Sequence, residues 1–307
     1  MFRYIVRRLL QGVLTFFGAT FIVYSLMFAG GGDPIQALAG EKPVSAQQRA
    51  ALTEQFHLNE GFFTRYLYFL RDFFTGNLQT SNRQDIFDQV GRALQLTGKI
   101  ALIAIVFTVV VGVSAGIVAA LRRGGVFDTS TLILTLVVIG IPSIVLAPLA
   151  QFLFGIQWKI FPVIYTPDKP FTSLILPGLV LGALSLATAM RLTRASFFDN
   201  LRADYVRTAT SKGLTRFRVV GVHVLRNSLI PIITFLGVEL GNLMGGAIVT
   251  EGVFNIPGIG GKLYRAIQLD DGPTVITFVS MLVVIYILAN LIVDVLYAVL
   301  DPRIRYE

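Results

Sequence analysis

Six long apolar runs, separated by short polar segments, divide this chain. Five of them contain no charged residue, and the fifth along the chain contains one, Glu239. The charged positions that bound the runs are 8 and 33, 99 and 122, 128 and 159, 169 and 191, 226 and 251, and 271 and 294. A helix that crosses a hydrocarbon core of about 30 Å needs roughly 20 such residues. The pattern predicts membrane-spanning helices near residues 9–29, 100–121, 130–154, 173–191, 228–249 and 274–297.

Composition supports a membrane protein and excludes two other classes. Charged residues make up 14% of the 307 and apolar residues 54%, whereas soluble domains carry about 25% charge. A soluble sphere cannot hide so much apolar surface, and disordered chains are polar and rich in charge. The chain has no cysteine, which removes disulfides, thiolate metal sites and cysteine nucleophiles from consideration.

The distribution of Lys and Arg predicts the orientation of the spans. If the N-terminus lies inside the cell, the inside segments hold fifteen Lys and Arg and the short outside loops hold four. Positive residues favour the cytoplasmic side, so we expect both termini in the cytoplasm, residues 30–98 outside and residues 192–227 inside. The net charge of +8 is then a topology signal, and no nucleic-acid partner is needed to explain it.

The predicted outer segment, residues 30–98, carries helical signals. Ser45 followed by Gln48 is a capping box that opens a helix through about Phe56. An aromatic stripe follows at helical spacing and ends before Gly76, and it consists of Phe62, Tyr66, Phe69 and Phe73. The stripe is typical of a helix at the outer membrane interface, and a docking surface for a solute-delivering protein is the second interpretation. Residues 85–96 predict a further amphipathic helix.

The inner segment, residues 192–227, is polar and basic but patterned. Apolar residues recur at helical spacing on both sides of Gly213: Leu201, Tyr205 and Ala209 before it, and Phe217, Val220 and Val224 after it. This spacing predicts two short helices hinged at the glycine. Apolar faces inside the cell need lipid headgroups or another protein to pack against.

Several motifs carry a family resemblance that spans nearly the whole chain in order. The run from Asp204 to Leu214 (DYVRTATSKGL), followed by Pro231, resembles the coupling loop of ABC-importer permeases, in the oligopeptide, dipeptide and nickel branch. Arg207 and Thr208 stand where the general pattern has Glu and Ala, while Ala209 and Gly213 match it. The same branch is resembled by RRLL at residues 7–10, GDP at 32–34, GNL at 76–78, EGVFNIPGIG at 251–260, DVLY at 294–297 and DPR at 301–303.

The resemblance implies a fold and a domain plan. The fold is all-α and polytopic, a type I ABC-importer permease of six transmembrane helices with a helical extracytoplasmic insertion between spans one and two. Residues 1–29 form the cytoplasmic N-terminus and span one, residues 30–98 the insertion, residues 99–300 a five-helix core that includes the coupling loop 192–227, and residues 301–307 a cytoplasmic tail. The chain is expected in the bacterial cytoplasmic (inner) membrane.

The resemblance also implies a function and partners. Such a permease pairs with a sister permease and two cytoplasmic ATPase subunits, and an extracytoplasmic binding protein delivers a di- or oligopeptide. Glutathione and nickel remain open as solutes. The residues of the loop implied to couple it to the ATPases are Tyr205, Arg207, Ala209, Lys212 and Gly213. No cofactor, metal or catalytic residue is expected in this chain, because the partner ATPases bind ATP and Mg.

Residue patterns argue against an enzyme. Lys262 follows glycines, but Ile256 and Leu263 stand where a phosphate-binding loop requires Gly and Ser or Thr. The two histidines, His57 and His223, are expected on opposite sides of the membrane. The alternative is a stand-alone secondary carrier or channel without ATPases, a class that often carries inverted repeats or several intramembrane charges.

Span five carries a glycine seam and one charge. Gly237, Gly241 and Gly245 lie four residues apart, which predicts close helix packing. Glu239 lies about 200° around the helix from the seam, and a charge in lipid costs about 2.5–3.5 kcal/mol. Glu239 is therefore expected either to line the translocation path or to form an ion pair at the interface with the sister subunit.

Overall fold

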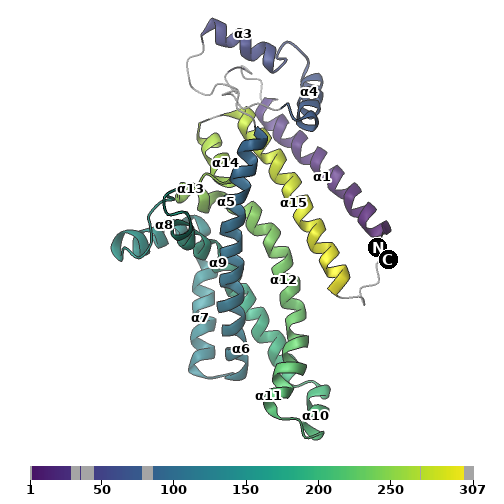
Figure 1. Ribbon diagram of the computed structural model, residues 1–307, viewed down its shortest axis with the longest axis vertical. Helices are drawn as coiled ribbons and strands as arrows, with labels where there is room; N and C mark the ends of the chain where they lie inside the picture. The colour runs from purple at the N-terminus through teal and green to yellow at the C-terminus, as the bar shows by residue number, and fades with distance from the viewer. Residues whose placement is uncertain (1, 29–34, 36–44, 78–85, 270, 301–307) are drawn as a thin grey trace. The chain divides into compact units, whose positions relative to one another are not determined.

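The computed structural model describes residues 2–28, 35, 45–77, 86–269 and 271–300 (Figure 1). The described part of the chain is helical and contains no strand. It divides into two compact units, Met1–Thr97 with Asn255–Glu307, and Gly98–Phe254. The predicted segment 30–44, the motif residues 32–34 and 78, Asp270 and the tail 301–307 lie wholly or largely outside the described residues.

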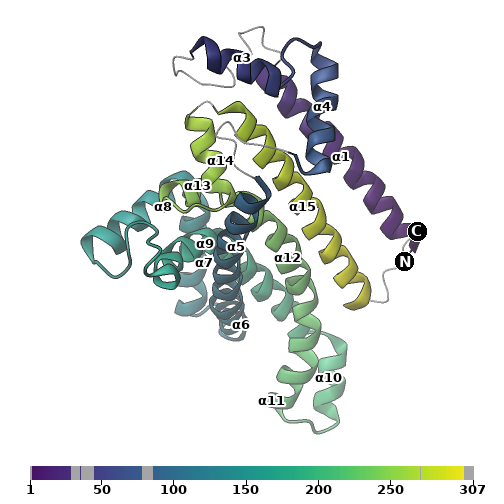
Figure 2. The same cartoon turned by 45° about the horizontal axis from the view of Figure 1, so that its top comes forward.

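The first unit is built on two apolar helices, α1 (Phe2–Phe28) and α15 (Gly272–Leu300), which lie side by side (Figure 2). Gly12 permits their close approach, because a Cβ at this position would lie 2.7 Å from Cγ2 of Ile287. The short helix α14 (Ile259–Gln268) packs on α15. The first part of α5 (Ile86–Phe107) belongs to this unit, and Thr97 Oγ1 accepts a 3.0 Å hydrogen bond from the backbone N–H of Ile259.

The predicted helices between spans one and two are confirmed. α3 (Ala46–Gln55) begins with the capping box, in which Ser45 Oγ accepts from Gln48 N at 3.2 Å and Gln48 Oε1 accepts from Ser45 N at 3.0 Å. α4 (Phe62–Thr75) ends at Gly76, whose φ of 79° is left-handed. The helix predicted for residues 85–96 is continuous with span two, since α5 runs from Ile86 into the membrane.

The aromatic stripe of α4 packs against α1 of the same chain. Tyr66 and Phe73 are buried, and Tyr66 Oη lies 2.9 Å from Thr20 Oγ1 on α1. The rings of Phe73 and Phe16 are 5.1 Å apart. This face is therefore occupied within the chain and is not free to dock a partner.

The second unit surrounds the longest helix, α9 (Pro170–Leu201). Span two continues from α5 through a π-helical segment, η1 (Thr108–Val113), into α6 (Ser114–Leu121). Span five is α12 (Leu225–Gly246), which follows directly on α11 (Arg216–Arg218) and the π-helical η3 (Val219–Val224). η1, α6 and α12 all pack on α9.

Four glycines account for the close packing around α9. A Cβ added at Gly116 would lie 2.6 Å from the carbonyl oxygen of Met190, and a Cβ added at Gly112 would lie 3.0 Å from the carbonyl oxygen of Leu186. On the facing helix, a Cβ at Gly182 would lie 2.8 Å from the carbonyl oxygen of Ala104, and one at Gly178 would lie 2.5 Å from Ile103 Cγ2. Small residues let membrane helices approach in this way. These four glycines therefore have a packing role.

Span three is broken. α7 (Val126–Gly140) and the following helix, α8 (Ser143–Ala150) with the π-helical η2 (Gln151–Gln157), bend by 106° at the break. Pro142 stands at the break because its ring fixes φ and it lacks a donor N–H. The span expected at residues 130–154 is therefore bent at Pro142 into two short helices. The described residues contain five helices long and apolar enough to cross a membrane, and six if the bent pair is one span.

The remaining short helix of the second unit is α13 (Ile248–Val253), which packs on α8 and α9. Gln151 Nε2 of η2 donates to the carbonyl oxygens of Val163, at 2.7 Å, and Val253, at 3.4 Å. A side-chain amide therefore ties the end of the broken span to a loop and to α13. Broken helices are tolerated at membrane depth where protein groups satisfy the freed backbone.

The glycine contacts predict a test of this packing. Gly116→Ala places a methyl group against the backbone of α9, which cannot rotate away, so we expect a loss of about 1–3 kcal/mol and a lower thermal unfolding midpoint. Gly91→Ala on α5 is the matched control, because a Cβ there meets no described atom within 4 Å. Equal unfolding midpoints for the two variants in detergent would contradict the packing role of Gly116.

Candidate coupling site

The segment with the coupling-loop resemblance forms a short helix, α10 (Asp204–Ser211). This helix follows α9 after a turn at Arg202 and Ala203, and it ends in a Schellman motif at Gly213. In that motif Gly213 N donates to Thr210 O at 2.9 Å, and Leu214 N donates to Ala209 O at 3.3 Å. The φ of Gly213 is +79°, a left-handed conformation that costs other residues roughly 1–2 kcal/mol. The predicted hinge at Gly213 is confirmed.

The helix on the other side of Gly213 differs from the prediction. α11 is only three residues long and runs through η3 into α12 as one continuous helical stretch. Leu201, expected on the first short helix, is the last residue of α9. The site is therefore one short helix, α10, between the ends of two spans (Figure 1). The residues after Gly213 extend the helix of span five and do not form a second short helix.

One side of α10 faces the chain itself. Ala209 is 7% exposed, and α10 packs on η3. Val206 of α10 packs against an apolar cluster formed by Phe197 of α9, Ala120 of α6 and Val224 of η3. This cluster, which we call the hub, joins three helices of the second unit at the base of α10. Ala209 belongs to the internal face of α10 and not to its outer surface.

The other side of α10 and the following turn are exposed. Tyr205 is 37% exposed and its hydroxyl donates to Asn200 Oδ1 at 2.5 Å. Arg207 and Lys212 are exposed, and Arg207 lies 3.9 Å from Asp204 in a solvent-facing pair. Phe217 has 88% of its surface exposed. Sequence reasoning placed Phe217 on an apolar face but did not separate it from the buried residues, because spacing alone cannot say which face meets the hub.

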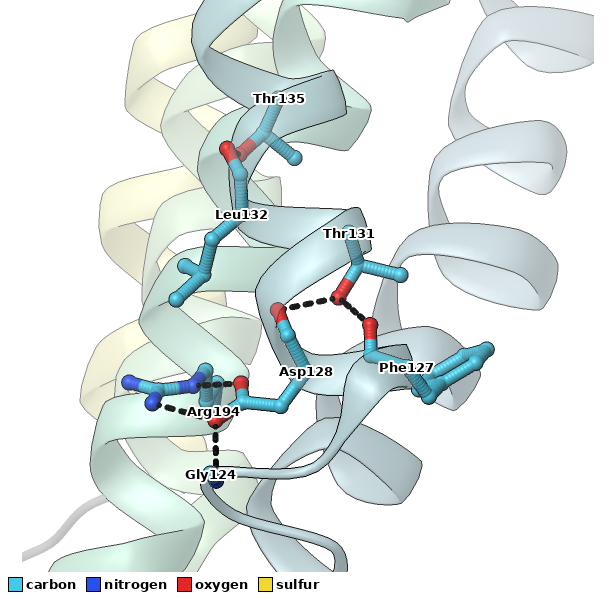
Figure 3. A network of polar contacts seen from close by, with 7 residues as sticks. All are labelled: Gly124, Phe127, Asp128, Thr131, Leu132, Thr135 and Arg194. Carbon is cyan, nitrogen blue, oxygen red and sulfur yellow. Dashed lines mark hydrogen bonds and ion pairs between the residues drawn. The ribbon is translucent and has the colours of Figure 1, made fainter.

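A buried ion pair fastens the turn between α6 and α7 to α9. Asp128, in the first turn of α7, is 2% exposed, and its carboxylate accepts from Arg194 Nη2 at 2.8 Å and from the backbone N–H of Gly124 at 2.9 Å (Figure 3). Arg123 and Arg202 extend the attachment, since their guanidinium carbons lie 3.6 Å and 4.2 Å from the ring centroid of Phe198. Phe198 borders the hub.

The sequence does not reveal this pair. Asp128 and Arg194 are separated by 66 residues, and each appears only as a charge at the end of an apolar run. No spacing rule pairs residues so far apart, and only the packing of α7 on α9 brings them together.

Glu239 is half-buried and has partners within the chain. Ser185 Oγ of α9 donates to Glu239 Oε1, and Asn242 Nδ2 lies 3.3 Å from Oε2. Ser185 is itself buried. The carboxylate therefore faces α9, near a contact in which Ala101 and Ala104 of α5 meet Leu243 of α12.

The glycine seam of span five is only partly packed within this chain. Gly241 is buried, but a Cβ at Gly245 would meet no described atom within 4 Å. Close helix packing at Gly245 stays a prediction, and so does close packing at Gly237. The two predicted roles of Glu239, in the path or at a subunit interface, also stay predictions.

Lys262 has a structural environment in the first unit. Its ammonium group donates to Gln89 Oε1 at 2.7 Å and lies 5.9 Å from the ring centroid of Phe278. Burial lowers the pKa of Lys262, and the positive charges of Arg92 and Arg265 lower it further. Lys262 is therefore held within the first unit by a hydrogen bond and an aromatic contact.

Comparison with known proteins places this arrangement in a family. The family described as "Binding-protein-dependent transport system inner membrane component" matches residues 112–306, and its N-terminal counterpart matches residues 1–86. The dipeptide transport system permease protein DppB of Alkalihalophilus pseudofirmus is 36% identical over the whole of both chains. DppB of Escherichia coli K12 and the glutathione transport system permease protein GsiC of the same strain are each 33% identical, again over the whole of both chains. The chain therefore belongs to the inner membrane components of binding-protein-dependent transport systems.

Proposed function

We propose that this chain is the permease subunit of an ATP-driven importer and carries di- or oligopeptides across the membrane. The names of its relatives support a peptide solute, since DppB is a dipeptide permease and glutathione is itself a tripeptide. Because the relatives are transport permeases, the chain acts as a transporter subunit and not as an enzyme.

The proposed assembly contains a sister permease, two cytoplasmic ATPase subunits and an extracytoplasmic binding protein. The family description supports a binding protein, because transport by these components depends on one. In this assembly ATP and Mg bind to the ATPase subunits, and both termini of the permease lie in the cytoplasm.

The observation that carries the proposal is the two-sided character of α10. Its exposed side presents Tyr205, Arg207 and Lys212, with Phe217 nearby in sequence, as a surface for an ATPase subunit. Its internal side reaches the hub, which contacts α6, α9 and η3 at once. A displacement of α10 by a closing ATPase pair then moves spans two, four and five together, because close-packed interiors transmit strain.

A secondary carrier remains the rival function, and one observation separates the two. An importer subunit copurifies with ATPases and supports uptake only when ATP is hydrolysed. Solute uptake by the chain alone in ATP-free vesicles would identify a carrier.

Gly213→Val tests the coupling role of the loop. Valine is strained at a φ of +79°, so the turn that positions α10 is expected to shift while membrane insertion continues. We expect loss of uptake and of solute-stimulated ATP hydrolysis in the assembled transporter. Gly221→Val on η3 is the matched control, since a Cβ there has open space, and it should retain both activities. Wild-type coupling in Gly213→Val would show that α10 is not the coupling element.

Asp128→Asn tests the attachment of α7 to α9. The change leaves the Arg194 charge without its carboxylate, and breaking a buried pair costs about 3–5 kcal/mol, with the lower end expected because Arg194 is a quarter exposed. The thermal unfolding midpoint should fall. Adding Arg194→Gln to the Asp128→Asn variant should lower the midpoint by less than Arg194→Gln lowers it in the otherwise unsubstituted chain. Asp204→Asn, in a pair that is open to solvent, should leave the midpoint unchanged. Additive effects in the double-mutant cycle would exclude coupling between Asp128 and Arg194.

Single cysteines test the proposed orientation. Gln47 on α3 and Thr210 on α10 are both exposed, and Gln47 is preferable to Gln48 because Gln48 closes the capping box. An impermeant thiol reagent added to intact cells should label Gln47→Cys and leave Thr210→Cys unlabelled until the membrane is opened. The unsubstituted chain is the blank, since it has no cysteine. Labelling of Thr210→Cys from outside would reverse the orientation.

A further inference from the structure

A cavity of about 230 Å³ lies in the first unit, at one end of spans α1 and α15. Its walls come from the last turns of α1, from α4 and the turn before it, and from the first turns of α15. Aromatic residues dominate the lining, among them Tyr24, Phe28, Tyr68 and Phe69. Neither the family resemblance nor the coupling site accounts for this cavity.

Arg65 of α4 brings a partly buried positive charge to the cavity. Its Nε and Nη1 atoms are shut off from solvent and have no hydrogen-bond partner among the described residues. Its guanidinium carbon lies 6.0 Å from the ring centroid of Phe28, too far for more than a weak cation–π contribution. These two atoms have lost water without gaining an acceptor, which is costly unless an anion accepts hydrogen bonds from them.

Among the described residues that line the cavity, no carboxylate is paired with Arg65. Asp72 also lines the cavity, but its Oδ1 accepts from Nε and Nη2 of Arg71 at 3.0 Å and 2.9 Å. Arg71 and Asp72 neutralise one another, so the three side chains carry a net charge of +1 with His57 counted as neutral. The cavity therefore matches a single negative charge.

The position of the cavity indicates where that anion comes from. Tyr24 and Phe28 close the apolar span of α1, while Pro273, Ile276 and Thr277 lie in the first turns of α15. The end of a span is the level of the lipid headgroups, where aromatic residues are enriched. The phosphodiester of a phospholipid carries one negative charge and lies at this headgroup level.

The outer face of α4 supports a lipid as the occupant. Phe63, Leu67 and Phe74 leave 70%, 63% and 66% of their surface exposed, although α4 is held against span one by Tyr66 and Phe73. The ring of Phe74 lies 5.6 Å from that of Phe16, twelve residues before the end of α1 and thus about 18 Å along it. An apolar face that follows a span to this depth contacts acyl chains.

We propose that the cavity is a phospholipid site, in which the phosphodiester of one lipid compensates Arg65 and its acyl chains lie along the apolar face of α4. The volume suits a phosphate with its glycerol, since it is below the roughly 300 Å³ of the smallest drug-sized pockets. The bound lipid fastens α4 to the end of span one.

The test uses the full chain purified with its copurifying subunits and stripped of lipid. Binding is measured as the shift in thermal unfolding midpoint on adding dihexanoyl phosphatidylglycerol below its micelle concentration, with inorganic phosphate and a dipeptide as separate additions. Native mass spectrometry counts the retained lipid. We expect the phospholipid to raise the midpoint and Arg65→Gln to weaken its binding about tenfold or more. Arg65→Lys, which keeps the charge, should bind at an intermediate level.

Arg92→Gln is the matched control, because Arg92 is exposed on α5 and does not line the cavity, while the substitution removes the same charge as Arg65→Gln does. It should bind the phospholipid as the unsubstituted chain does. An equal shift with inorganic phosphate would make the site one for free anions, and an equal shift with the dipeptide would make it a solute site; either result overturns the proposal. Undiminished lipid binding by Arg65→Gln also overturns the proposal. If Arg65→Gln does not fold, the proposal is overturned when Arg65→Lys binds the lipid as the unsubstituted chain does and Arg92→Gln binds it more weakly.

Discussion

Hydrocarbon offers the backbone no hydrogen-bond partner, and the rest of this structure depends on that constraint. A chain in lipid must satisfy its own N–H and C=O groups, and helices do so within one segment. Every described element is accordingly helical. Three buried hydroxyls follow the same rule, because Thr20, Thr193 and Ser280 each donate to the carbonyl four residues earlier in their own helix. Among the candidate spans of the described residues, the one sharp break, at Pro142, is followed at once by helix again.

Once the backbone is satisfied, the helices need a separate reason to associate, since lipid is as apolar as their side chains. Close approach supplies it, because backbones that touch gain dispersion contacts which larger side chains would prevent. Gly116 and Gly182 place α6 and α5 directly against the backbone of α9. Polar contacts are few by comparison, and two of them, Asp128 with Arg194 and Ser185 with Glu239, again involve α9. The second unit is thus organised around a single helix.

This organisation connects the family's function to local chemistry. α10 is exposed on one side, while its other side rests on the hub at the ends of α6, α9 and η3. The turn between α6 and α7 is held to the same place by the Asp128–Arg194 pair and by the two guanidinium groups on Phe198. The proposed coupling role requires such a junction, because work done on a small surface helix would have to reach several spans without being absorbed by loose side chains.

The sequence by itself determined the approximate positions of the apolar spans, the capping box of α3, the end of α4 at Gly76 and the turn at Gly213. Each follows from a local rule, such as the length of an apolar run or the backbone freedom of glycine, that depends only on neighbours along the chain. The family resemblance was also legible in the sequence, and the matches at residues 1–86 and 112–306 confirm it.

Only the tertiary structure decided which face of each helix is occupied and by what. Periodicity marked Ala209 and Phe217 alike as apolar, yet one is buried and the other is 88% exposed, because burial depends on which helix packs opposite. The aromatic stripe of α4 was interpreted as a face for the membrane interface or for a docking partner, whereas the structure packs it against α1. The pairing of Asp128 with Arg194 and the isolation of Arg65 arise between segments far apart in sequence. Charge compensation depends on distance in space, and no pattern along the chain records that distance.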